Sequence, residues 1–127
     1  MTISTDIFIH DLILNFHEIK DEVLDEDYLG LFSQQIGCFR EFTQKAIDDN
    51  NINLALKCFE FVAEYLPKVI FEVENSLVIS CLGKLKIPKG SQIEGLIPKE
   101  LKSIIDSLEA YYNENLNEKT QRLIKNM

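Results

Sequence analysis

The most apolar stretch of the chain is VIFEVENSLVISCLGKL, residues 69–85, and it limits most narrowly what the protein can fold into. At 100° per residue its apolar side chains cover well over half of a helix circumference and leave a narrow polar stripe. A helix of this kind belongs inside a bundle. We therefore predict a central apolar helix over about residues 67–85, with Pro67 in its first turn, where proline is tolerated.

A β-strand is the alternative interpretation of this stretch, because Val69, Phe71 and Val73 alternate and β-branched residues are frequent. Strands of globular proteins are usually 3–10 residues long, and 69–85 contains no internal turn signal. No partner strand is evident in the neighbouring sequence. The pattern therefore favours a helix.

Glu74 interrupts the apolar pattern, because it projects between Ile70, Cys81 and Leu85 on the helical wheel. A carboxylate on an apolar face must be paired, hydrogen-bonded or protonated. We expect Glu74 and Asn75 to be structural polar residues. An enzyme built around Glu74 would need a second titratable group in an open pocket, and the sequence identifies none. Nucleophile elbows, phosphate loops, dinucleotide fingerprints and CxxC pairs are missing, so the prediction is a protein without catalytic residues.

Apolar residues at helical spacing predict further helices on both sides of the central one. These helices cover about residues 5–24, 26–48, 52–65 and 98 onward, and a polar tail helix to about 125 follows a break at 113–117. The polar turn at 48–53 is short, so residues 26–66 are expected to form an antiparallel helical hairpin. The expected fold is an all-α, single-domain bundle of five to six helices over residues 1–127.

Composition places the chain among globular proteins, with 127 residues, 46% hydrophobic and 27% charged. No run of about 18 apolar residues is present, so no membrane-spanning helix is expected. The N-terminal stretch lacks the basic region of a signal peptide. Cys38, Cys58 and Cys81 are odd in number and lie in apolar segments, which favours buried free thiols in a reducing compartment. The expected location is the cytoplasm.

The distribution of charge says more than the net value of −8. Residues 1–66 carry 13 acidic and 4 basic side chains, a balance of −9, whereas residues 67–127 carry 8 acidic and 9 basic ones. An acidic surface repels phosphate backbones, so nucleic-acid binding is not expected. The same surface attracts a basic protein at rates that depend on salt.

The acidic run in residues 18–27 is the main candidate for a binding site. We expect it to dock a basic partner, and the alternative is a solvated helix end with favourable caps. Neither a calcium-binding loop pattern nor metal-binding spacing of His10 and His17 is present, so no metal or other cofactor is expected. The candidate partner-binding residues are Glu18, Asp21, Glu22, Asp25, Glu26 and Asp27, with Asp48 and Asp49 as a weaker second group.

Three segments together resemble a known family. They are IGCFREFTQKAIDDNNINLALKCFEFV (36–62), ENSLVISCLGKL (74–85) and IPKELKSIID (97–106). The chain resembles a family of small, uncharacterised, all-helical bacterial proteins over about residues 36–106. Some members are encoded beside polymorphic or contact-dependent toxins and are suspected immunity proteins. The resemblance implies no catalytic residues, and Glu74 and Asn75 match its most recognisable polar positions.

Charge and resemblance together predict an immunity protein of a contact-dependent growth inhibition or related system. Its acidic surface would bind and neutralise a basic toxin domain, because nuclease toxins must hold nucleic acid. The alternative is a helical scaffold or adaptor without catalytic activity that binds a peptide or protein partner. The charge of the partner distinguishes the two, since an adaptor has no reason to prefer a basic folded domain.

Overall fold

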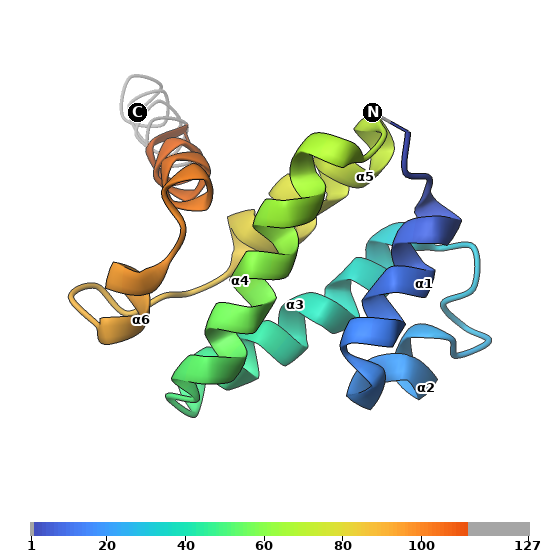
Figure 1. Ribbon diagram of the computed structural model, residues 1–127, viewed down its shortest axis with the longest axis horizontal. Helices are drawn as coiled ribbons and strands as arrows, with labels where there is room; N and C mark the ends of the chain where they lie inside the picture. The colour runs from blue at the N-terminus through green and yellow to red at the C-terminus, as the bar shows by residue number, and fades with distance from the viewer. Residues whose placement is uncertain (1, 112–127) are drawn as a thin grey trace, which may run out of the picture.

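A computed structural model describes residues 2–111, which fold as an all-α bundle, as the sequence predicts (Figure 1). The α-helices are α1 (Thr5–Asn15), α2 (Lys20–Val23), α3 (Phe32–Asp48), α4 (Ile52–Tyr65), α5 (Phe71–Ser76), α6 (Gln92–Leu96) and a last helix over 99–111. Tighter or wider helical turns occupy His17–Ile19, Leu66–Lys68, Leu77–Cys81 and Leu82–Lys84. The predicted break at 113–117 and the tail helix lie outside the described residues.

The α3–α4 hairpin forms the middle of the bundle. Asn50 adopts a positive φ of 54° in the turn, and the Asn51 side chain accepts a hydrogen bond from the Leu54 amide at 3.3 Å. An asparagine cap of this kind satisfies one of the free amides at the helix start. The helix predicted over 52–65 is confirmed. The hairpin begins at Phe32 rather than near residue 26, because residues 24–31 form successive turns instead of a helix.

The prediction of one continuous helix over residues 67–85 is wrong, because the structure divides this segment into several short helical pieces. Pro67 lies in a 3₁₀ turn, and Val69 forms an isolated parallel bridge with Ile3. The Ile70 amide donates to the Ile3 carbonyl at 3.0 Å, so the chain is extended before α5 begins at Phe71. A π turn over Leu77–Cys81 and a 3₁₀ turn then follow. Backbone pairing with the N-terminal residues, which the local pattern does not reveal, competes here with helix formation.

The predicted burial of Glu74 is also wrong, because the Glu74 side chain is exposed. The prediction assumed 100° per residue from Ile70 to Leu85. Ile70 lies outside the helix, and a π turn holds more residues per turn than an α-helix, so the phase shifts before Cys81. From Phe71 to Leu82, the buried apolar positions are Val73, Leu77, Cys81 and Leu82, and Ser76 is buried with them. Glu74 and Asn75 therefore point to solvent and are not core polar residues.

The helix predicted over 5–24 is divided at Phe16, whose backbone leaves the helical region at φ −133° and ψ 66°. The division turns α2 toward α3, where the buried Gln35 side chain donates to the Val23 carbonyl at 3.1 Å. Phe16 itself is fully buried. The break therefore depends on packing between segments distant in sequence.

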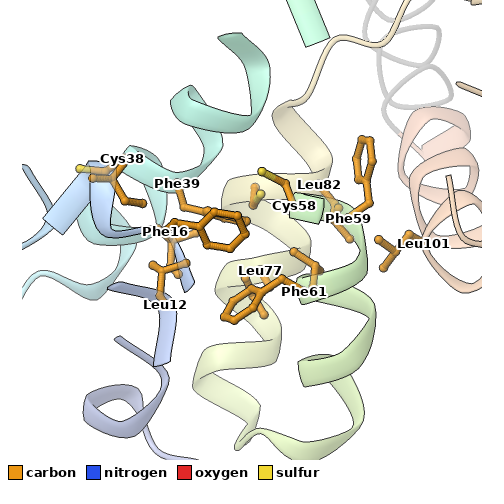
Figure 2. Close-up of a cluster of buried hydrophobic side chains, with 14 of the residues drawn as sticks. Leu12, Phe16, Cys38, Phe39, Cys58, Phe59, Phe61, Leu77, Leu82 and Leu101 are labelled. Atoms are coloured by element: carbon orange, nitrogen blue, oxygen red, sulfur yellow. The ribbon is translucent and has the colours of Figure 1, made fainter. Parts of the chain in front are cut away.

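The core joins these segments through aromatic rings (Figure 2). The Phe16 ring lies 5.3 Å from the Phe39 ring and 5.4 Å from the Phe61 ring, centroid to centroid. Such tilted and edge-to-face pairs stabilise a core beyond the area they bury. Elsewhere α6 packs against α4, and Leu101 of the last helix is fully buried. Among the described residues, none of the helices is both long and apolar enough to cross a membrane.

Cys38, Cys58 and Cys81 are buried free thiols, as predicted. Burial raises the pKa of Cys58 to about 11 and that of Cys81 to about 12. At neutral pH these two thiols are therefore protonated and unreactive.

Candidate functional site: an acidic face

The six carboxylates of residues 18–27 are all exposed, and we call the surface of this segment the acidic face. It consists of Glu18, Asp21, Glu22, Asp25, Glu26 and Asp27. Glu18 lies on the 3₁₀ turn, Asp21 and Glu22 on α2, and the other three on the turns that follow. All six side chains of the predicted run are exposed, and the segment that carries them is α2 with the turns before and after it (Figure 1).

Buried residues hold this segment in place. Ile19 and Val23 are four residues apart and are both buried, so the intervening carboxylates face outward. Asp25 organises the turns that follow, because its side chain accepts a hydrogen bond from the Asp27 amide at 2.9 Å and its carbonyl accepts one from the Tyr28 amide. Aspartate commonly stabilises turns in this way. The carboxylates of the acidic face therefore lie on an ordered surface.

The acidic face contains six carboxylates and one cation, the exposed Lys20 of α2. From Asp21 to Asp27, no carboxylate lies within 4.0 Å of a lysine or arginine nitrogen of residues 2–111. Glu18 approaches the Nδ1 atom of His17 at 3.4 Å, which is an ion pair only when the imidazole is protonated. An unmatched cluster of this kind produces a negative potential that extends into solvent.

Asp48 and Asp49 do not join the acidic face. Asp48 is the last residue of α3 and Asp49 is its C-cap, at the opposite end from the contact between Gln35 and Val23, about 20 Å away along the helix axis. The Asp49 carboxylate accepts from Lys45 Nζ at 2.9 Å, and Asp48 accepts from Gln44 Nε2 at 2.9 Å. These carboxylates belong to a separate surface with mixed charge. The structure therefore divides the predicted binding residues into two groups.

Glu22 extends the acidic face toward α3, where it approaches Cys38. Burial, and then the charge of Glu22, raise the pKa of the Cys38 thiol to about 11. Glu41 contributes in the same direction. Glu22 and Glu41 line a small hollow of about 170 Å³ together with Arg40. Sequence reasoning missed Glu41, which is fourteen or more residues beyond the acidic run and joins it only through the packing of α2 on α3.

The exposed apolar residues near the acidic face were also missed. Leu29 was expected on the buried stripe of a helix starting near residue 26, but the structure leaves it exposed because α3 starts only at Phe32. Gly30 has a φ of 80°, a left-handed conformation that glycine adopts without strain. The sequence signal available was Gly30 between two leucines, which is typical of a turn as well as of a helix.

The histidines of α1 and the following turn are separate exposed residues. His10 Nδ1 lies 3.5 Å from Asp11 Oδ1, and His17 lies beside Glu18. Within residues 2–111, no cluster of three or more histidine, cysteine, aspartate or glutamate side chains is arranged to hold a metal ion. The geometry of the site is that of an exposed charged surface suited to binding a macromolecule.

Comparison with known proteins gives one match. A family model described as a domain of unknown function (DUF7674) matches residues 9–113. The match is wider than the 36–106 region of the sequence resemblance and includes the whole acidic face. No curated protein and no solved structure matches the chain.

Proposed function

We propose, for a chain that belongs to the DUF7674 family, that its acidic face binds and neutralises a basic protein, in the manner of an immunity protein. The observation that carries the proposal is the set of six exposed carboxylates in a segment with one lysine, Lys20. From Asp21 to Asp27 these carboxylates form no ion pair with a lysine or arginine of residues 2–111. A basic partner supplies the missing cations and is steered to the surface by its potential.

A toxin that acts on nucleic acid fits this surface best. Such a toxin needs a positively charged cleft to hold phosphates, and an acidic protein competes for that cleft. The assignment to an immunity role and to a bacterial system rests on the family resemblance of the three segments described above, and that to the cytoplasm rests on the free cysteines. The charge complementarity supports the class of partner independently.

The test is a binding experiment with the product of the neighbouring gene, using two variants with the same change in net charge. Asp21→Lys/Glu26→Lys alters the acidic face, and Asp48→Lys/Asp49→Lys alters the other end of α3. We expect the first variant to weaken the complex by about 100-fold at low salt, and the second by less than about threefold. Affinities are measured by calorimetry at 50 and 500 mM salt, and circular dichroism checks the fold of each variant.

The outcomes separate three cases. Loss of affinity confined to the first variant, with recovery of toxin activity, supports neutralisation through the acidic face. Equal weakening by both variants means that net charge alone attracts the partner, which contradicts a defined site. No complex at either salt concentration means that the immunity role is wrong.

A scaffold or adaptor without catalytic activity is the second candidate. The hollows beside exposed leucines in segment 24–31 favour it, because a peptide can bind there. An adaptor would bind its partner without suppressing an activity. Both functions predict a complex with the partner, but only the immunity function predicts that the complex lacks toxin activity. The toxin-activity measurement therefore distinguishes them.

A further inference from the structure

Two adjoining hollows of about 400 and 510 Å³ form a groove next to the acidic face. They share Gly30, Phe32 and Glu72 as lining residues. Four segments contribute to the walls: α1, the turns of residues 24–31, the start of α3 and the start of α5. We call this surface the apolar groove.

The walls of the apolar groove carry large apolar side chains that are exposed by more than a third. Phe71 is 77% exposed, Leu29 55%, Leu31 52% and Leu24 38%. They are four of the nine exposed large apolar residues in the described part of the chain. Single exposed apolar residues are ordinary, but a concentration of them around one hollow is typical of an interaction site.

The charges that line the apolar groove are all negative, apart from the titratable His10. Asp6 on α1 and Glu72 on α5 are both exposed lining residues, and no lysine or arginine of residues 2–111 lines either hollow. Other hollows of the molecule differ. Arg40 and Lys84 accompany the glutamates of the hollow beside Cys38, for example. The hollow beside Cys38 thus mixes both charges, whereas Asp6 and Glu72 line the apolar groove without a described lysine or arginine.

We infer that the apolar groove binds a cationic amphipathic segment of a protein partner. The apolar face of such a segment packs against Leu29, Leu31 and Phe71, and its lysines or arginines lie beside Asp6 and Glu72. An amphipathic helix meets this requirement when its apolar residues recur every three or four positions. The inference deepens and rests on the proposed function, since it states how a basic partner engages the molecule beyond the acidic face.

Other occupants fit the charges less well. A second copy of the chain in a symmetric contact would bring Asp6 and Glu72 of each groove toward the same residues of the other, and like charges repel. Nucleic acids and anionic membrane surfaces are repelled by the same carboxylates. A cationic segment alone satisfies both the apolar walls and the negative charges.

The first probe is a synthetic 14-residue helix of leucine and lysine with one tryptophan on its apolar face. Because the protein contains no tryptophan, the fluorescence of the peptide reports its binding without background. The control peptides are a shuffled sequence of the same composition and a version with glutamate in place of lysine. We expect the amphipathic cationic peptide to bind at least about tenfold more tightly than either control.

Matched variants locate the site. Leu31→Ser/Phe71→Ser removes exposed apolar contacts and should weaken the peptide complex by about tenfold or more. Leu14→Ser is the control, because Leu14 is 67% exposed on α1 but does not line the groove. Glu72→Gln should weaken binding by a smaller factor and reduce its salt dependence. All these positions are exposed, so the variants should retain the wild-type melting temperature.

With the peptide, equal affinity of the Leu31→Ser/Phe71→Ser variant and the wild type would overturn the inference. Sedimentation of the free protein as a dimer that the same variant dissociates would also overturn it. Such a dimer identifies a second copy as the occupant.

The complex with the neighbouring gene product separates this inference from the proposed function. If Asp21→Lys/Glu26→Lys weakens that complex and Leu31→Ser/Phe71→Ser does not, the acidic face binds the partner and the groove does not. If the neighbouring gene product forms no complex but the groove still binds the cationic peptide as expected, the neutralising function is wrong and the inference about the groove stands.

Discussion

The two ends of α3 each carry a group of carboxylates, but their surroundings differ. At its C-terminal end, Asp48 and Asp49 accept hydrogen bonds from Gln44 and Lys45, and the surface has mixed charge. Near its N-terminal end, the carboxylates from Asp21 to Asp27 have no lysine or arginine within ion-pair distance among the described residues. Both groups are acidic in the sequence, but only the group near the N-terminal end of α3 is left without a cation in ion-pair contact among the described residues.

The comparison shows that a count of carboxylates does not identify a binding surface. A carboxylate whose charge is matched within the molecule offers little to a partner, and exposed ion pairs contribute little to stability. An unmatched cluster held on an ordered segment is a better candidate. Three measurements test whether the N-terminal end of α3 is the more ordered and more strongly charged of the two.

The largest expected effect concerns the attachment of the acidic face to the core. Phe16→Ala should lower the free energy of unfolding by about 3–5 kcal/mol, because a fully buried ring packed between Phe39 and Phe61 is lost. Phe71→Ala, at an exposed ring, should cost less than about 0.5 kcal/mol. Urea unfolding followed by circular dichroism measures both. If Phe16→Ala lowered the free energy of unfolding by as little as Phe71→Ala, the segment bearing the acidic face would be only loosely attached to the core.

An intermediate effect compares two glutamines of α3. Gln35→Met leaves the buried Val23 carbonyl without its donor and should cost about 1–3 kcal/mol. Gln44→Met removes exposed hydrogen bonds to the Lys86 backbone at 2.8 and 2.9 Å, which water can replace, and should cost less than about 1 kcal/mol. Equal losses in urea unfolding would contradict the view that α2 is tied to α3 more firmly than the 86–89 loop is.

The smallest expected effect is electrostatic and uses Cys38 as a reporter. Glu22→Gln should lower the pKa of the Cys38 thiol from about 11 toward its ordinary value of 9.0, while burial keeps it above that value. The pKa of Cys58, also about 11 but with burial as the main cause, should change little. Titration of the cysteine ¹³Cβ chemical shifts in the folded protein measures both values. An unchanged pKa at Cys38 would mean that Glu22 does not influence this region.

The same shifts imply a direction for stability at alkaline pH. A thiol with a pKa raised on folding favours the protonated folded state, so its stabilising contribution is complete below pH 9. The contribution is lost as the pH rises through about 11. In the Glu22→Gln variant the Cys38 pKa is lower, so the stabilising contribution of this thiol should be lost at a lower pH than in the wild type.

The sequence was sufficient for the helical class of the fold, for α4, and for three buried thiols. These features depend on local periodicity and on capping side chains, which neighbouring residues decide. The long helices predicted over 5–24 and 67–85 were wrong for one reason. Phe16 and Val69 leave the helix because distant partners, the core rings and Ile3, stabilise another backbone conformation.

The candidate site divides in the same way. The sequence by itself determined that residues 18–27 are strongly acidic. Only the tertiary structure decided that Asp48 and Asp49 lie elsewhere and that Glu41 joins Glu22. It also decided that Leu29, Leu31 and Phe71 remain exposed around a groove. Charge and periodicity are properties of short segments, whereas the matching of charges and the covering of apolar surface depend on which distant segments pack together.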